Sequence, residues 1–169
     1  MFRRKFRSQV GITLIEMLST VVIMGIVSSM AVPRFQKAYE RMKFRSAGRD
    51  LQSTLRVARS TAISDKEPYG ILVNPDLKTV TIFQDSLNQS NYTYDHGDPI
   101  VRVDTLPAEF EWLQMDTDNS VMIFLPNGSA KFTGGGYIWA LAQTEDVISL
   151  LSYNVLASTG RIKFEGFYY

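Results

Sequence analysis

Apolar positions along the chain fall into three successive patterns. Residues 12–32 are almost continuously apolar, and Glu16 is their only charged member. Residues 34–64 place apolar residues at a helical period, and from Tyr69 on short apolar runs alternate with turn residues, which is typical of strands. One long helix followed only by strands predicts an α+β fold, with the helix packed on an antiparallel β-sheet.

The first apolar segment is long enough to cross a bilayer. It has 21 residues, and about 20 apolar residues in a helix span the hydrocarbon core. A secretory signal peptide would use Ser29-Met30-Ala31 as its cleavage site. A plain membrane anchor would leave Glu16 as a cost of roughly 2.5–3.5 kcal/mol near the bilayer centre. A third interpretation is a filament-forming helix, in which Glu16 has a function in assembly.

The stretch G-I-T-L-I-E-M-L, after a short basic leader, resembles the cleavage and methylation motif of type IV prepilins and type II secretion pseudopilins. In that family a membrane peptidase cuts after the glycine and the new amine is N-methylated. The resemblance implies that residues 1–11 are a leader, cut between Gly11 and Ile12, and that Ile12 is methylated. Ile12 stands where the family usually has phenylalanine. The resemblance assigns filament assembly to Glu16, Gly25 and Pro33.

A carboxylate at Glu16 has a physical use once the leader is gone. Cleavage leaves a positive amine at the end of an apolar helix. A carboxylate about one turn along can neutralise the amine of a neighbouring subunit, because two desolvated charges are tolerable only when paired. Apolar helices in lipid otherwise lack a hydrophobic drive to associate. Glu16 is therefore predicted to favour docking into a growing filament.

Residues 34–66 are predicted to continue as an amphipathic helix beyond a membrane and filament-core helix at 12–33. Pro33 is expected to kink the join, because it removes a backbone donor and clashes with the preceding turn. Pro68 is expected to end the helix near Asp65. The apolar positions recur at i, i+4 and i+7: Phe35, Tyr39 and Met42, then Leu51, Leu55, Ala58 and Ala62.

Residues 67–169 are predicted to form a β-rich globular head. Turn residues at 74–76, 127–128 and 158–160 predict three hairpins, and the glycines at 134–136 a flexible turn. The helix end L-R-V-A-R-S-T-A-I-S, the later F-L-P-N-G-S-A and the terminal S-T-G-R-I-K resemble the GspH/FimT branch of pseudopilins. That branch contains minor pseudopilin H of type II secretion and related minor type IV pilins. The resemblance implies a type IV pilin-like fold.

The net charge of +1 is unevenly distributed along the chain. Four of the 18 basic residues lie in the leader, so 14 basic residues face 17 acidic ones once residues 1–11 are removed, a net of −3. A mildly acidic body argues against a chain-wide nucleic-acid surface. The absence of cysteine means that the fold needs no disulfide.

Candidate catalytic groups are few. His96 has Asp95 and Asp98 beside it, but the stretch lies among turn residues and is read as a surface loop. The oxygen side chains at 116–119 lack the central glycine and terminal glutamate of an EF-hand. No phosphate-binding loop, serine-elbow motif or cysteine nucleophile is present. The sequence predicts a non-enzymatic protein with no catalytic residue, metal site or cofactor.

The terminal G-R-I-K is a candidate DNA contact. Some FimT-like minor pilins bind DNA through a basic motif of this kind, which would correspond here to Arg161 and Lys163. The two residues alternate with Ile162 and Phe164, the pattern of a strand with one solvated face. Two charges are a small footprint, and Glu165 lies beside them, so nucleic acid is a secondary alternative.

The motif places the N-terminus in the cytoplasm and the head in the periplasm, with one pass through the bacterial inner membrane. The charge count does not support this orientation, because basic residues also crowd positions 34–49. The expected partners are other pseudopilins or pilins of the same filament, a prepilin peptidase and methyltransferase, the inner-membrane assembly platform and the lipid bilayer.

The function predicted from these features is that of a minor pseudopilin in a type II secretion pseudopilus, which supports protein export across the outer membrane. A FimT-like minor type IV pilin, acting in pilus assembly or DNA uptake, is the first alternative. A signal-anchored periplasmic domain is the second.

Overall fold

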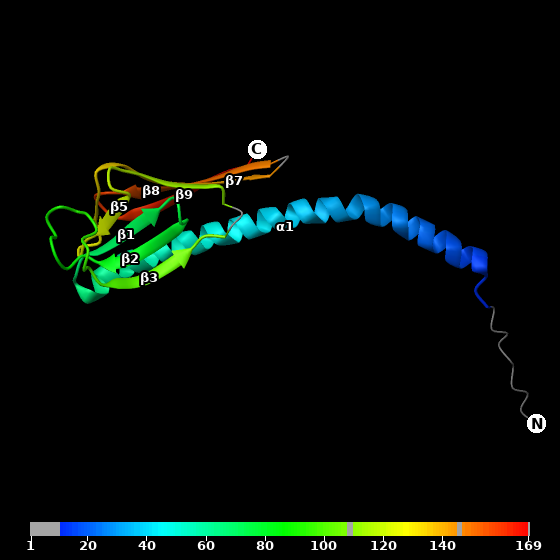
Figure 1. Ribbon diagram of the computed structural model, residues 1–169, viewed down its shortest axis with the longest axis horizontal. Coiled ribbons are helices and arrows are strands. Elements are labelled where there is room, and N and C mark those ends of the chain that lie inside the picture. The colour runs from blue at the N-terminus through cyan, green and yellow to red at the C-terminus, as the bar shows by residue number, and fades with distance from the viewer. Residues whose placement is uncertain (1–10, 108–109, 145–146, 169) are drawn as a thin grey trace, which may run out of the picture. The chain divides into compact units, whose positions relative to one another are not determined.

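The structure, a computed structural model, describes residues 11–107, 110–144 and 147–168. A single long helix, α1 (Leu14–Asp65), is followed by nine strands in this part of the chain (Figure 1). The chain divides into two compact units between Glu40 and Arg41, and the second unit, from Arg41 on, is called the head unit or head below. The strands are β1 (Tyr69–Asn74), β2 (Thr79–Gln84), β3 (Ile100–Thr105), β4 (Trp112–Thr117), β5 (Val121–Phe124), β6 (Ala130–Lys131), β7 (Gly134–Thr144), β8 (Val147–Leu156) and β9 (Arg161–Tyr168).

Helix α1 is continuous from one end to the other. Pro33 lies inside it and does not end it, although the ring leaves one carbonyl of the preceding turn without its helical partner. The kink at Pro33 stays a prediction. The helix ends at Asp65, as predicted, and Lys66 follows with a left-handed φ of 58°. The Tyr69 hydroxyl donates to Asp65 Oδ2 at 2.8 Å, which fastens β1 to the helix end.

The strands form two antiparallel sheets, ordered β3-β2-β1-β5-β6 and β4-β7-β8-β9. The hairpins predicted at 74–76, 127–128 and 158–160 are confirmed as β1–β2, β5–β6 and β8–β9. The glycines at 134–136 form the start of β7 rather than a flexible turn. They lie opposite a register shift between Met115 and Thr117 of β4, where the missing side chains let the strand bend.

The core of the head lies between the part of α1 from Phe44 on and the two sheets. Leu51, Leu55, Ala58 and Ala62 are all buried there, which confirms the second predicted stripe. The first stripe is different, because Phe35, Tyr39 and Met42 are 75%, 61% and 69% exposed. Burial along the helix begins only at Phe44. Helical spacing reveals an apolar face, but it does not say what covers that face.

Gly48 lies against β8 of the second sheet. The Tyr153 hydroxyl, buried on β8, donates to the Gly48 carbonyl at 2.5 Å. A Cβ at position 48 would lie 2.6 Å from Leu151 Cδ1 and 3.0 Å from the Tyr153 hydroxyl oxygen. A larger residue at this point of the helix would have to displace these two buried side chains of β8.

Candidate functional site

The predicted cleavage junction lies just before α1. Gly11 and Ile12 are described, exposed and outside the helix, which begins at Leu14. The four basic leader residues lie outside the described part of the chain. The structure does not test the cut between Gly11 and Ile12 or the methylation of Ile12, and both stay predictions.

Glu16 closes a capping box at the start of α1. The backbone N–H and the hydroxyl of Thr13 each donate to Glu16 Oε2 at 3.1 Å, and the Glu16 N–H donates to Thr13 Oγ1 at 3.3 Å. These bonds satisfy backbone donors that the first helical turn cannot pair internally. The carboxylate therefore has a local structural role beside the predicted intersubunit role. The signature Thr-x-x-Glu before an apolar run could have predicted this cap.

The apolar first part of α1 has no other described element of the first unit packed against it. Its large side chains between Ile12 and Val32 are 52–84% exposed, and the helix is long and apolar enough to cross a membrane by length and composition. A Cβ added at Gly25 would meet nothing within 4 Å. The described residues therefore give no internal reason for glycine there, and the assembly roles of Gly25 and Pro33 stay proposals.

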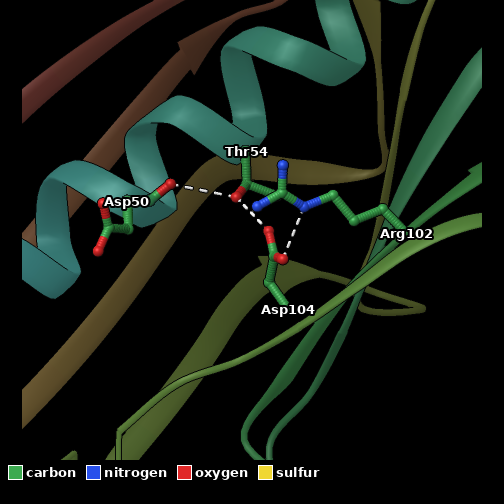
Figure 2. A network of polar contacts seen from close by, with 4 residues as sticks. All are labelled: Asp50, Thr54, Arg102 and Asp104. Atoms are coloured by element: carbon green, nitrogen blue, oxygen red, sulfur yellow. Dashed lines mark hydrogen bonds and ion pairs between the residues drawn. The ribbon is translucent and has the colours of Figure 1, made fainter.

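A polar network ties the edge strand β3 to the helix. Thr54 is 3% exposed, and its hydroxyl lies 2.5 Å from Asp104 Oδ2 and 3.1 Å from the Asp50 carbonyl oxygen. Arg102 Nε donates to Asp104 Oδ1 at 2.7 Å, and Figure 2 shows the four residues together. Burial alone would raise the pKa of Asp104, but the bonds from Thr54 and Arg102 and the Arg102 charge hold it below its ordinary value.

Asp98 organises the loop between β2 and β3. Its Oδ1 accepts bonds from the Ser86 N–H at 3.0 Å, the Ser86 hydroxyl at 3.2 Å and the Leu87 N–H at 3.1 Å, and its Oδ2 accepts the Asp95 N–H at 3.0 Å. Burial favours the neutral acid, but these donors outweigh it and lower the pKa of Asp98. The ionised carboxylate thus holds the loop together.

Asp85, at the start of the same loop, has a pKa shifted in the opposite direction from that of Asp98. It is 1% exposed, and neither carboxylate oxygen has a hydrogen-bond partner among the described residues. Burial, followed by the charges of Asp98 and Asp95, raises the pKa of Asp85 from its ordinary 3.8 to about 6. The fold therefore disfavours the charged form of Asp85 and favours the charged form of Asp98.

Asp85→Asn is expected to stabilise the head at pH 8 and not at pH 4. The folded state binds the Asp85 proton more tightly than the unfolded state, so the free energy of unfolding of the wild type falls as pH rises between about 4 and 6. We expect the variant to be about 1–2 kcal/mol more stable at pH 8, because one unit of raised pKa corresponds to about 1.4 kcal/mol and the buried asparagine amide itself carries a desolvation cost. Urea unfolding at both pH values measures the difference. An equal difference at pH 4 and pH 8 would contradict this assignment.

The other candidate chemistry is not assembled into a site. His96 is exposed in the loop, and the oxygens of Asp95 and Asp98 face backbone and amide donors instead. Asp116 and Asp118 are exposed at the end of β4. Among the described residues, no three acidic or histidine side chains gather closely enough to hold a metal ion.

Arg59 joins the helix to two turns of the head. Its Nε donates to the Gly128 carbonyl and its Nη2 to the Thr159 carbonyl, each at 3.0 Å. Gly160 has a φ of +59°, and a Cβ there would lie 2.2 Å from the Gly128 carbonyl oxygen. The glycine of the G-R-I-K motif thus has a structural role, because it lets the two turns meet at Arg59.

Arg59→Met is expected to destabilise the head by about 2 kcal/mol, because it keeps the aliphatic stem but removes charged donors from the Gly128 carbonyl, where the bond is partly buried, and from the exposed Thr159 carbonyl. Thermal unfolding of the full chain in detergent measures the loss. Arg49→Met, at an exposed position on the same helix, is the matched control. A loss no larger than that of the control would show that the Arg59 bonds are not needed.

Arg161 and Lys163 are both exposed on β9, but the structure separates their surroundings. Arg161 lines a groove with Arg56 and Arg59 of α1, and Lys163 is not part of its wall. The grouping of these three arginines was not predicted, since α1 and β9 are about a hundred residues apart. The candidate DNA contact at Arg161 and Lys163 stays a proposal.

Comparison with known proteins shows where this fold recurs. The type IV minor pilin FimU of Pseudomonas aeruginosa PAO1, solved in space group P21, is 21% identical with a TM-score of 0.51, covering 75% of this chain and 90% of that one. A second crystal form, P65, gives 19% identity and a TM-score of 0.48, covering 72% and 91%. The first likeness confirms the type IV pilin-like α+β fold. A search of curated proteins finds no match.

A scan against family models matches residues 47–152 to Type II transport protein GspH. The matched region runs from the buried part of α1 to β8 and takes in well over half of the chain. It lies entirely within the head unit, so the resemblance first carried by the N-terminal motif is confirmed by an independent part of the sequence. The chain belongs to the GspH family of type II secretion pseudopilins, which are structural, non-enzymatic proteins.

Proposed function

We propose that the chain is a minor subunit of a type II secretion pseudopilus. It is made with the leader 1–11, cut between Gly11 and Ile12 and methylated on Ile12. The helix 12–33 holds it in the inner membrane with the head in the periplasm. It then enters a filament of related subunits and supports protein export across the outer membrane.

The observation that supports this proposal most directly is the uncovered apolar surface of α1. The large apolar side chains at 12–32 are more than half exposed. Soluble proteins rarely leave so large an apolar surface in contact with water. Lipid before assembly and neighbouring helices after assembly would both cover it. Membership of the GspH family supports coverage by neighbouring helices in a filament as well as coverage by lipid.

Intact-mass spectrometry of the chain expressed with and without a prepilin peptidase tests the processing step. We expect the loss of residues 1–11 and the gain of one methyl group, both only when the peptidase is present. A cut near Ala31 would instead indicate a secreted domain. An unprocessed chain in both samples would leave a simple anchor and contradict the proposal.

A minor type IV pilin that handles DNA is the second candidate. It is favoured by the likeness of the fold to a type IV minor pilin and by the exposed Arg161 and Lys163 on β9. Under this alternative, the full chain in detergent binds DNA with an affinity that falls with salt and is lost in Arg161→Ala. Under the preferred function, the wild type and this variant are alike and bind no DNA at physiological salt.

A further inference from the structure

The groove beside Arg161 carries positive charge that its own walls do not balance. It encloses roughly 750 Å³, with walls from α1 and from the β8–β9 turn and the first residues of β9. None of the residues that line it is acidic. The wall residues that matter here are Arg56, Arg59, Ile63, Thr159, Arg161 and Ile162.

The three guanidinium groups retain donors that can reach a ligand. Arg59 uses two of its five N–H bonds on the Gly128 and Thr159 carbonyls, and the other three have no acceptor among the described residues. Within the same part of the chain, the side chains of Arg56 and Arg161 form no ion pair or hydrogen bond. Glu165, on the same strand, is four residues from Arg161, or about 13 Å at a strand's rise per residue.

The groove also offers apolar surface beside the charges. Ile63 is 42% exposed on α1, and Ile162 is half-buried at the start of β9. A guanidinium fork pairs best with a carboxylate or phosphate oxygen pair. The flanking isoleucines add a preference for a ligand that carries an apolar side chain next to its anionic group.

The charge of the head favours a peptide over a nucleic acid. Residues 41–169 contain 12 basic and 15 acidic residues, a net of −3 (12 − 15), so the groove is a local exception. Two exposed arginines can neutralise about two phosphates, far fewer than the roughly six to ten contacts of a firm DNA complex. A single carboxylate, in contrast, can be neutralised by the two exposed arginines of the groove.

We propose that this groove binds an aspartate or glutamate side chain, flanked by an apolar residue, from a neighbouring pilin-like subunit. The proposal rests on the proposed function, because that function supplies the neighbour. Arg56 and Arg161 hold the carboxylate, and Arg59 fixes the distance between the two walls. A contact of this kind selects one neighbour over another through its charge.

Zero-length crosslinking with a water-soluble carbodiimide tests the proposal in membranes that contain the whole secretion system. Arg56→Lys and Arg161→Lys keep the charge and introduce an amine, which forms an amide only with a carboxylate in direct contact. We expect amides to an aspartate or glutamate of another pilin-like subunit, located by mass spectrometry. They should form at least about five times more often than in Arg49→Lys, because a groove that pairs its charges holds the carboxylate in place.

Three outcomes are decisive. Crosslinks no more frequent than in the exposed Arg49→Lys control, in membranes where the wild type enters filaments, would overturn the groove proposal and leave the proposed function intact. Salt-dependent DNA binding that is lost in Arg161→Ala would overturn it in favour of nucleic acid. If the wild type does not enter filaments at all, the proposed function fails and the groove proposal fails with it.

Discussion

Glu16→Gln is expected to reduce entry of the chain into filaments at least ten-fold while leaving the head as stable as the wild type. Glutamine at this position still completes a capping box with Thr13, so α1 should begin at the same residue. What it loses is the negative charge that would pair with a neighbouring amine. Removing one partner of a desolvated ion pair costs about 3–5 kcal/mol, and about 1.4 kcal/mol is already ten-fold in an equilibrium.

Two further variants separate capping from charge. Glu16→Ala removes both and should assemble no better than Glu16→Gln, whereas Glu40→Gln removes a charge from the same helix outside the apolar segment and should assemble normally. The fraction of chain recovered with sheared filaments is the measurement. If Glu16→Gln assembled like the wild type while Glu16→Ala did not, Glu16 would act through its helix cap alone.

Gly48→Leu is expected to destabilise the head by about 3 kcal/mol, the upper end of the cost of overpacking a filled core. Leucine favours helix more than glycine by roughly 0.5–1 kcal/mol, so local preference alone would predict the opposite sign. The new side chain must displace Leu151 and Tyr153, both fully buried, and it breaks the hydrogen bond to the Gly48 carbonyl.

Thermal unfolding of the full chain in detergent, followed by near-ultraviolet circular dichroism, measures this loss. Ser53→Leu is the matched control, because Ser53 is exposed on the same helix and should tolerate leucine without loss. Tyr153→Phe should cost only about 1 kcal/mol, the worth of one hydrogen bond. Equal stability of Gly48→Leu and Ser53→Leu would show that β8 does not approach the helix as closely as described.

Features set by neighbouring residues could be predicted from the sequence. The end of α1 at Asp65 follows from local chain chemistry, and so do the three hairpins and their turns. The buried stripe at Leu51 and Leu55 follows from helical spacing, because one face of the helix must meet the sheets. The N-terminal motif could be identified without knowledge of the fold, since it consists of consecutive residues.

Features that depend on distant residues could not be predicted. The Tyr153 hydroxyl meets Gly48 across 105 positions, and Arg59 meets Thr159 across 100. The raised pKa of Asp85 could not be predicted either, because it comes from burial and from the charges of Asp98 and Asp95, which no local sequence pattern specifies. Phe35 and Tyr39 share the helical spacing of the buried stripe but are exposed, because spacing alone does not specify which apolar residues are covered.

The cap at Thr13 has a consequence for proteolysis. A peptidase must bind the residues around the scissile bond as an extended strand, and a helix hides that backbone in its own hydrogen bonds. Thr13 and Glu16 cap the first turn of α1, which begins at Leu14. Gly11 and Ile12 therefore lie before the helix, where they are exposed and non-helical. The predicted Gly11–Ile12 junction therefore lies two residues before α1, where the backbone is exposed and outside the helix.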